Sequence, residues 1–332
     1  MTRVLLCVGG SVEKFLTSEM LADLADKTEL EMRNGIEKDE QVYSTAIREA
    51  GAEIVITGWG SPLLTSTILG DNPQVKYMCH LTGGLRANVT REVIEDGFLV
   101  TNWGTLIGPT VAEAALLGIL CCLRQTTMFT FMMHRDGGWR DHEKDVESLY
   151  GKPVGLHGFG NIARSLVGLL RPFGCEVSAF DPHVADSVFV EYGVRRVEDL
   201  ETLYAKNRVI SIHAPKIPET HHSVNSDILA SMQDGASVVN TARGSVIETQ
   251  ALVRELKSGR ISASLDVYEE EPLPEDSPLR GLPNCHLTCH TAGPTPDRMV
   301  HIGHAALENV QRYINGGDVL HRVDLAQYDL MT

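Results

Sequence analysis

The chain has 332 residues, enough for two domains of ordinary size with a large core. Its composition, 43% apolar and 22% charged, is that of a soluble globular protein. The formal net charge of −15 gives a surface that repels phosphate backbones and anionic lipids. Nucleic acids and membrane surfaces are therefore excluded as expected partners.

The cysteines and the apolar runs indicate a reducing compartment. The seven cysteines are odd in number, and their spacings fit neither C-x-x-C nor a zinc-binding pattern. The N-terminal "MTRVLLCVGG" has too short an apolar run for a signal peptide and is typical of a buried strand. The run "AALLGILCCL" at 114–123 lies between Glu113 and Arg124 and is too short to span a bilayer. We therefore expect a cytoplasmic protein in which this run is a buried helix.

Strand-like runs recur along the chain, separated by helical stretches. In chain order they are "RVLLCVG", "AEIVITGW", "VKYMCHLT", "FLVTNW", "KPVGLHG", "CEVSAFDP", "RVISIHAP", "ASVVNTARG", "SASLDVY" and "CHLTCH". Many are continuously apolar, which is typical of parallel strands buried on both faces. Ten runs are too many for one compact domain, so we expect an α/β fold with two doubly wound parallel-sheet domains. "SDILASMQ" and "TQALVRELKSG" are helix candidates, and a long helix from about 110 to 133 would link the domains.

The segment "KPVGLHGFGNIARSLVGLLRPFG" carries Gly158-x-Gly160-x-x-Ala163 between a predicted strand and a predicted helix. Glycines at such a turn let backbone amides approach a pyrophosphate at the helix N-terminus. The next strand ends at Asp181, where a carboxylate would accept hydrogen bonds from ribose hydroxyls and repel a 2′-phosphate. This spacing predicts NAD rather than NADP, and a turn without ligand is the alternative. His157 is expected to be a hydrogen-bonded core histidine rather than a catalytic one.

Four later segments resemble the D-isomer-specific 2-hydroxyacid dehydrogenase family. They are "GWR" at 138–140, "HAPKIPET" at 213–220, "NTARGSVIETQALVRELKSGRISASLDVYEEEPLP" and "LPNCHLTCHTAG". The resemblance is strong from about 98 to 310 and weaker, but collinear, from 1 to 97. It implies a flavodoxin-like substrate domain formed by residues 1–101 and 293–332. A Rossmann NAD-binding domain, residues 102–292, would be inserted between them.

The resemblance also implies roles for single residues. Arg243 matches the substrate-binding arginine, His290 the acid/base, and Glu271 the carboxylate partner of that histidine. Asp266 matches the aspartate near the nicotinamide carboxamide. The chemistry is consistent with these types of residue. An imidazolium can protonate the oxygen of a ketone that receives a hydride, a carboxylate stabilises that imidazolium, and an arginine fork binds a substrate carboxylate.

Within "LDVYEEEP" the resemblance therefore selects Glu271, whereas Glu269 and Glu270 are expected to be solvated loop charges. We expect no metal site, because His221 and His222 lie in a polar loop without partners at ligand spacing. The expected cofactor contacts are Gly158, Gly160, Asn161, Ile162, Asp181, His213, Pro215, Thr220, Thr241, Ala242, Asp266 and Gly293. The expected substrate contacts are Gly83, Gly84, Arg86 and Arg243.

The chain departs from the family pattern at several positions. Cys289 stands where the family usually has proline, and Ala114 replaces the histidine of V-A-E-H. In the substrate loop "HLTGGLRANV", Thr82 replaces a glycine, and Arg86 and Val89 replace acids. Arg86 either binds a second polar or anionic group of a larger substrate or is an interdomain or surface arginine with a local acidic partner.

The expected function is NAD-dependent interconversion of a 2-oxo acid and a D-2-hydroxy acid. One alternative is a larger sugar-derived or phosphorylated 2-hydroxy acid as substrate, and another is a dinucleotide-sensing binding protein like the family's corepressors. The apolar helix near 111–133 and the segment "RDGGW" resemble the arm through which the family dimerises. We therefore expect a homodimer with two-fold symmetry.

Overall fold

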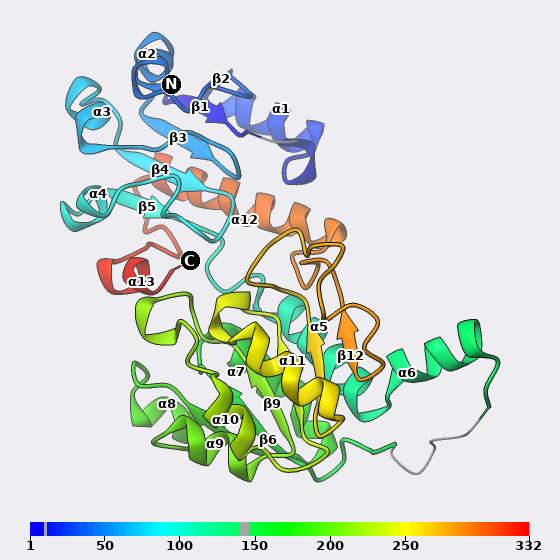
Figure 1. Cartoon of the computed structure of the whole chain (residues 1–332). Helices are drawn as coiled ribbons and strands as arrows, with labels where there is room; N and C mark the ends of the chain where they lie inside the picture. Colours follow the sequence, from blue (N-terminus) through cyan, green and yellow to red (C-terminus); the bar gives the residue numbers. More distant parts are fainter. Residues whose placement is uncertain (10–11, 140–145, 332) are drawn as a thin grey trace. The chain divides into compact units, whose positions relative to one another are not determined.

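The computed structural model describes residues 1–9, 12–139 and 146–331 (Figure 1). Its internal contacts divide the chain into two compact units. Unit 1 comprises Met1–Leu106 and Thr295–Thr332, and unit 2 comprises Ile107–Pro294. Each unit contains one parallel sheet with helices around it, so the predicted α/β fold class with two parallel-sheet domains is confirmed.

The sheet of unit 1 has the strand order β2-β1-β3-β4-β5, and every pairing is parallel. Its strands are β1 (Arg3–Cys7), β2 (Glu29–Met32), β3 (Ile54–Thr57), β4 (Tyr77–His80) and β5 (Leu99–Thr101). The strand order reverses between β1 and β3. Ligands of open α/β sheets bind beyond the carboxyl ends of the strands at such a reversal, so this edge is the functional edge of unit 1.

Helices cover both faces of this sheet and bury its apolar strands. They are α1 (Ser18–Lys27), α2 (Glu40–Ala50), α3 (Ser66–Asp71), α4 (Arg91–Glu95), α12 (Pro296–Ile314) and α13 (Leu325–Leu330). One core joins Leu5, Val55 and Met78 of the strands to Tyr43 of α2. The C-terminal segment completes the unit, because α12 packs on β4 and α13 packs on α4.

The sheet of unit 2 has the order β12-β11-β10-β9-β6-β7-β8, again with parallel pairings throughout. Its strands are β6 (Pro153–His157), β7 (Glu176–Phe180), β8 (Arg195–Arg196), β9 (Val209–Ile212), β10 (Ser237–Asn240), β11 (Ser262–Leu265) and β12 (Cys285–Leu287). The order reverses between β6 and β9. The Gly-rich loop follows β6 and therefore lies at the position where doubly wound sheets bind dinucleotides.

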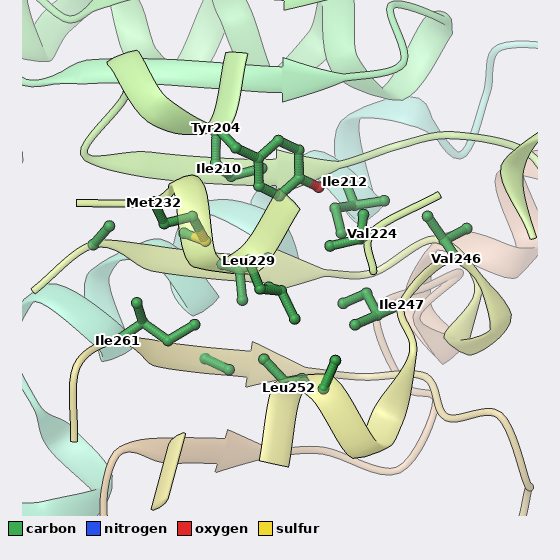
Figure 2. Packing of buried hydrophobic residues seen from close by; sticks show 14 of the residues in the cluster. Tyr204, Ile210, Ile212, Val224, Leu229, Met232, Val246, Ile247, Leu252 and Ile261 are labelled. Carbon is green, nitrogen blue, oxygen red and sulfur yellow. The ribbon is translucent and has the colours of Figure 1, made fainter. Parts of the chain in front are cut away.

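Two cores lie on the two faces of the unit 2 sheet. The helices are α5 (Gly108–Leu123), α6 (Thr126–Phe131), α7 (Asn161–Leu170), α8 (Asp186–Tyr192), α9 (Leu200–Lys206), α10 (Ser226–Ser231) and α11 (Thr249–Ser258). Figure 2 shows one core, a cluster that includes Leu229 of α10, Leu252 of α11, and Ile210 and Ile212 of β9. The other core places α5 and α7 against the strands. Burial on both faces explains why these strands are continuously apolar.

All ten strand-like runs contain a strand in the structure, but β2 and β8 were not anticipated. Both are edge strands, and their sequences "ELEM" and "RR" are rich in charge. An edge strand is partly solvated, so it need not be apolar. Sequence patterning therefore detects the buried strands of these sheets and misses the exposed ones.

The prediction of one long helix from about 110 to 133 is wrong. Helix α5 ends at Leu123, and α6 with the following turn at Met132–Asp136 is bent from it by 66°. Gln125 between them has a left-handed backbone (φ 51°), which an α-helix cannot contain. Among the described residues no single helix is long and apolar enough to cross a membrane, although this bent pair passes a test of length and composition alone.

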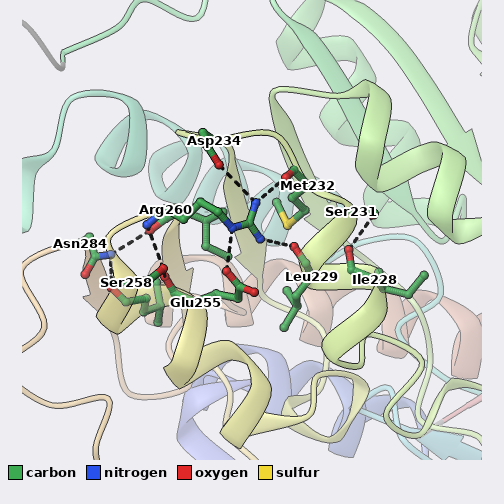
Figure 3. A network of polar contacts seen from close by, with 11 residues as sticks. Ile228, Leu229, Ser231, Met232, Asp234, Glu255, Ser258, Arg260 and Asn284 are labelled. Atoms are coloured by element: carbon green, nitrogen blue, oxygen red, sulfur yellow. Dashed lines mark hydrogen bonds and ion pairs between the residues drawn. The ribbon is translucent and has the colours of Figure 1, made fainter.

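Arg260, in the turn before β11, stabilises the amino-terminal edge of the unit 2 sheet (Figure 3). Its guanidinium donates to the carbonyls of Leu229 and Met232 at the end of α10 and pairs with Glu255 of α11 at 2.8 Å. Asn284 donates to the carbonyls of Leu256 and Ile261. These contacts hold α10 and α11 against the sheet at the edge opposite to the Gly-rich loop.

Candidate active site

The Gly-rich loop has the geometry that a pyrophosphate needs. Gly158 has φ +96°, and a Cβ there would lie 2.7 Å from the Ala214 amide nitrogen, so only glycine fits. Gly160 is the N-cap of α7, and a Cβ there would meet nothing within 4 Å. Asn161 and Ile162 begin that helix. An open helix N-terminus with closely approachable amides is the known means of binding a dinucleotide phosphate.

Asp181 follows β7 and is held beside this loop. Its Oδ2 accepts the Phe159 amide at 2.8 Å, and its Oδ1 accepts the His183 amide at 2.9 Å. Each carboxylate oxygen can accept a second hydrogen bond. The geometry therefore holds a carboxylate beside the Gly-rich loop, and its predicted contact with the adenosine ribose stays a prediction.

The turn after β10 contains a polar atom that lacks a partner. The Oγ1 of Thr241 is buried and has no hydrogen bond among the described residues. Asn240 shapes this turn by accepting the Ala242 amide at 3.0 Å and donating to the Arg243 carbonyl at 2.9 Å. A buried hydroxyl without a partner costs free energy unless a ligand satisfies it. Thr241 and Ala242, both expected cofactor contacts, therefore fit a bound dinucleotide.

The other expected cofactor contacts form the loop after β9 and the end of unit 2. Thr220 donates through Oγ1 to the Pro215 carbonyl at 2.6 Å, which closes the loop. His213 is bonded to Ser211 at 2.9 Å, and burial lowers the pKa of its imidazole to about 3. Gly293 lies against Val111 of α5. The structure thus places these residues at the carboxyl-terminal edge of the unit 2 sheet, although their contact with a cofactor stays a prediction.

His157 is a core residue, as predicted. It is buried in β6 and bonded through Nδ1 to the Tyr204 hydroxyl at 3.2 Å. Burial lowers the pKa of the imidazole to about 4. This histidine is therefore neutral at physiological pH and serves packing.

Two of the predicted catalytic side chains are in direct contact. His290 Nδ1 lies 2.7 Å from Glu271 Oε2, and Glu271 Oε1 accepts the Tyr268 amide at 2.9 Å. Burial opposes ionisation of Glu271, but the Tyr268 amide, His290 and the charge of Arg243 outweigh it and lower the pKa of the carboxyl. Since Nδ1 faces the carboxylate, Nε2 is the nitrogen that can exchange a proton with a substrate.

Arg243 lies near the same carboxylate. Its guanidinium is half-buried, and its Nη1 donates to the Ala242 carbonyl at 2.6 Å. Burial lowers the pKa of the guanidinium, and the negative charge of Glu271 opposes that shift. Unit 2 therefore brings together Arg243, Glu271 and His290, which lie up to 47 positions apart in the sequence.

Asp266 has a role that the sequence did not reveal: it holds the loop that carries His290. It is buried, and its carboxylate accepts the amides of Thr291 and Ala292, each at 2.8 Å, and the Thr288 hydroxyl at 2.6 Å. The Asp266 carbonyl accepts the His290 amide at 2.8 Å. His290 adopts a left-handed backbone (φ 55°), which is strained for a residue with a side chain. The clamp supplies the contacts that maintain this conformation.

Glu269 was expected to be a solvated loop charge, and it is exposed, but it also has partners that the sequence did not reveal. Its Oε2 accepts the Thr249 amide at 3.0 Å at the start of α11, and its Oε1 contacts His222. Burial opposes its ionisation, but hydrogen bonds from Thr249 and His222 outweigh that effect and lower the pKa of the carboxyl. Glu269 thus stabilises a helix N-terminus, where a negative charge is favourable. Glu270 is exposed.

In unit 1, the substrate loop is organised by a buried histidine. His80 at the end of β4 is bonded through Nδ1 to Thr57 at 2.8 Å and through Nε2 to Thr82 at 2.6 Å. Burial lowers its pKa to about 3, although the Gly84 backbone opposes the shift. Gly83 is fixed by its carbonyl, which accepts Asn102 Nδ2 at 2.9 Å.

Arg86 is engaged away from the glycines of this loop. Its Nη2 donates to the Asp329 carbonyl at 2.7 Å in α13, and Arg91 pairs with the carboxylate of the same aspartate. Of the two readings of Arg86, this contact supports a surface arginine with a local acidic partner. Its predicted contact with substrate is not supported by the orientation of its side chain.

A cavity of about 670 Å³ lies elsewhere in unit 2, at the amino-terminal edge of the sheet, and its lining includes Ser237, Ala263 and Asn284. Because the glycines of the Gly-rich loop and the His290–Glu271 pair lie at the other edge, we assign the candidate active site there. Among the described residues no three His, Cys, Asp or Glu side chains are grouped as a metal site would require.

The chain matches a known protein family and several known proteins. The family described as D-isomer specific 2-hydroxyacid dehydrogenase, NAD binding domain, matches residues 116–292. A hydroxypyruvate reductase of Thermotoga maritima is 32% identical over 301 residues, which cover 89% of this chain and 94% of that protein. A D-3-phosphoglycerate dehydrogenase of Methanocaldococcus jannaschii is 30% identical over 303 residues, and these span 91% of this chain but only 56% of that protein.

The fold has close counterparts among solved structures. A phosphoglycerate oxidoreductase from Rhizobium etli superposes with a TM-score of 0.81 at 25% identity, covering 97% of this chain and 98% of that one. The matched family covers the Gly-rich loop, Arg243, Glu271 and His290. The chain therefore belongs to the D-isomer specific 2-hydroxyacid dehydrogenase family, and its unit 2 contains the family's NAD-binding domain.

Proposed function

We propose that this protein interconverts a 2-oxo acid and a D-2-hydroxy acid with NAD as the cofactor. The observation that carries the proposal is the 2.7 Å contact between His290 Nδ1 and Glu271 Oε2, with Arg243 close enough to affect the charge of the same carboxylate. A positioned acid/base beside a cation that can grip a carboxylate is what reduction of a 2-oxo acid requires.

Each of these side chains has a separate task in the proposed reaction. Bound NADH supplies the hydride, and NAD accepts it in the reverse direction. His290 donates a proton from Nε2 to the carbonyl oxygen as negative charge develops there. Glu271, whose pKa is lowered further below neutral by its partners, is ionised, stabilises the resulting imidazolium charge and orients the ring. Arg243 binds the substrate carboxylate through its guanidinium fork.

The amides of Gly83 and Gly84 in unit 1 are the further carboxylate donors that we propose. A larger sugar-derived or phosphorylated 2-hydroxy acid is the alternative substrate class, and it depends on Arg86. Because Arg86 donates to Asp329, we do not assign it a substrate group. If it nevertheless binds one, Arg86→Ala should lower kcat/KM for phosphorylated or polyhydroxy 2-oxo acids by about tenfold or more, a loss of about 1.4 kcal/mol.

The test is steady-state oxidation of NADH with a panel of 2-oxo acids. Turnover of at least one acid would support the proposal if a stereospecific assay identifies the product as the D-hydroxy acid. A dinucleotide-sensing binding protein would instead bind NADH tightly, measured by calorimetry, without turnover of any acid. Formation of the L-hydroxy acid would contradict the stereochemistry proposed here.

We also propose a cytoplasmic homodimer. Seven thiols without disulfides support a reducing compartment. Large apolar side chains are exposed at Leu117 of α5 and at Met133 and Trp139 after α6, which supports a role of this region as a dimerisation arm. Arg140 of the "GWR" motif lies outside the described residues. Light scattering of the purified protein should give twice the chain mass of 36.4 kDa, and a monomer at micromolar concentration would contradict the proposal.

A further inference from the structure

The loop after β9, residues 213–222, connects two parts of the candidate active site. At its start, a Cβ on Gly158 of the Gly-rich loop would lie 2.7 Å from the Ala214 amide nitrogen, so the two loops pack backbone against backbone. At its end, Nε2 of His222 contacts Glu269 Oε1 in the loop after β11. All of these residues belong to unit 2, so the arrangement lies within one compact unit.

Glu269 is fixed by two further contacts. Its Oε2 accepts the Thr249 amide at 3.0 Å, at the start of α11. A Cβ on Gly244 would lie 1.8 Å from the Tyr268 carbonyl carbon and 2.4 Å from the Glu269 amide nitrogen. The turn after β10 therefore packs directly on the backbone that carries this carboxylate. His222 thus contacts a carboxylate whose position is set by two neighbouring loops.

The backbone of His222 is strained and depends on its contacts. It is left-handed (φ 51°), which is unfavourable for a residue with a Cβ. Its amide donates to the Ser245 carbonyl at 2.9 Å, and its ring stacks on that of His221 with centroids 4.0 Å apart. A strained conformation persists only where its surroundings maintain it. Loss of the contact with Glu269 should therefore allow this turn to relax.

The expected cofactor contact Thr220 is bonded to the same turn. Its carbonyl accepts the Ser223 amide at 3.2 Å and the Ser223 hydroxyl at 3.0 Å. Its Oγ1 accepts the Ile217 amide at 3.1 Å and donates to the Pro215 carbonyl at 2.6 Å. Relaxation at His222 would therefore move Thr220 and, through it, Pro215. Two expected cofactor contacts thus depend on a pair of side chains that are not themselves expected contacts.

We propose that His222 and Glu269 are positioning residues that hold the loop after β9 in the conformation that binds the dinucleotide. This role rests on the proposed function, because it takes NAD as the cofactor, and it assigns residues that set cofactor affinity. Glu271 serves a proton donor, whereas Glu269 serves a loop. Loss of the His222–Glu269 pair should therefore weaken NADH binding without slowing the reaction once NADH is bound.

The test separates the Kd for NADH, measured by fluorescence titration, from kcat at saturating NADH with the 2-oxo acid that the wild-type protein reduces fastest. His222→Ala and Glu269→Gln should each raise Kd about fivefold, equivalent to about 1 kcal/mol, and leave kcat within about twofold. The double variant should show no further rise, because either substitution already breaks the pair. His222→Gln, whose amide can donate to the same carboxylate, should restore Kd to within about twofold of the wild-type value.

Glu255→Gln is the matched control. It replaces a carboxylate of the same helix, α11, and breaks the 2.8 Å pair with Arg260 at the edge opposite to the Gly-rich loop. This variant should lose stability without any change in the Kd for NADH. A rise in Kd as large as that of Glu269→Gln would show that any weakening of α11 loosens the cofactor, and it would overturn the proposed role of the pair.

An unchanged Kd in His222→Ala and Glu269→Gln would also overturn it, as would a double variant whose Kd rises by the product of the two single effects. If His222→Ala does not fold, Glu269→Gln supplies the same comparison. A wild-type protein that binds NADH but reduces no 2-oxo acid would overturn the proposed function alone, because the Kd values still test the pair. A wild-type protein that does not bind NADH would overturn both.

Discussion

The carboxyl-terminal edges of the two sheets carry different kinds of polar groups. In unit 2, His290 is half-exposed and contacts the carboxylate of Glu271. In unit 1, His80 is buried and contacts only the hydroxyls of two threonines and the loop backbone. The same type of residue, at the same edge of a similar sheet, is therefore exposed beside a carboxylate in one unit and buried and neutral in the other.

The difference shows how a two-unit enzyme can separate chemistry from recognition. A histidine needs access to solvent or substrate and a counter-charge if it is to change its charge during a reaction. Burial without a carboxylate removes both, and the imidazole becomes a neutral bridge in a hydrogen-bond network. We propose that proton transfer occurs at the edge of unit 2 that carries the charged groups, and that amides and hydroxyls at the edge of unit 1 bind substrate.

Replacement of His290 should have the largest effect if unit 2 performs the chemistry. His290→Gln removes the acid/base and should lower kcat by about 10²–10⁴, the range for general acid–base catalysis. The Kd for NADH, measured by fluorescence titration, should change little because Gln keeps the size of the side chain. A variant that reacts at close to the wild-type rate would remove His290 from its assigned role.

Asp266→Asn tests the clamp that supports His290. The amide group of Asn cannot accept the amides of Thr291 and Ala292 on both sides, so one buried donor is left unpaired. The free energy of unfolding should fall by about 1–3 kcal/mol, measured by urea denaturation, and kcat should fall with it. Unchanged stability with a raised KM for NADH would show that Asp266 acts as a cofactor contact instead.

Asp181→Ala tests coenzyme choice at the same edge. In this variant the ratio of kcat/KM with NADH to that with NADPH should fall about tenfold, which is the effect expected for the loss of one hydrogen bond to a charged group. Competition assays with both coenzymes measure the ratio. A wild-type preference for NADPH would contradict the assignment of Asp181 to the ribose hydroxyls.

The burial of His80 can be tested through the dependence of the free energy of unfolding on pH. Its folded-state pKa of about 3 lies below the value of about 6.5 in an unfolded chain, so stability is present above pH 6.5 and is lost as pH falls toward 3. Each such histidine adds about 1.4 kcal/mol per pH unit to that loss. His157 and His213, also lowered by burial, act in the same direction.

His80→Gln should therefore reduce the slope of unfolding free energy against pH by about 1 kcal/mol per pH unit between pH 6 and 5. An unchanged slope in His80→Gln would contradict the assignment of His80 as a buried, neutral histidine.

The three neighbouring glutamates give the smallest and most selective effects. In the pH–rate profile, the rate of reduction should fall as pH rises, because the proton donor is lost. Glu271→Gln should move this fall to a pH about one unit lower, because the imidazolium loses its carboxylate. Glu270→Gln should leave the profile in place. Glu269→Gln should also leave it in place but lower stability by about 0.3–1 kcal/mol, since a charge at the N-terminus of α11 is lost. A profile moved by Glu270→Gln would shift the catalytic role by one position.

Much of this protein could be predicted from its sequence because the informative residues are local. Buried parallel strands are apolar throughout, and a phosphate-binding turn needs glycines at fixed positions, so the fold class and the Gly-rich loop follow from short segments. The motifs around Arg243, Glu271 and His290 identified the family, which the comparisons confirm. The edge strands β2 and β8 were not predicted, because partly solvated strands need not be apolar.

Four features were decided only by the tertiary structure. They are the break of the helix at Gln125, the hydrogen bonds of Asp266 to the His290 loop, the cap of α11 by Glu269 and the hydrogen bond of Arg86 to Asp329. Each depends on which distant donor or acceptor is brought within about 3 Å. A carboxylate can serve catalysis, capping or loop support in the same local sequence, so the sequence around it does not say which. The sequence by itself determined most of the buried elements and the reacting residue types, because these follow from local chemistry, whereas the edge strands, the helix break and the partners of each charged group follow from packing across the chain.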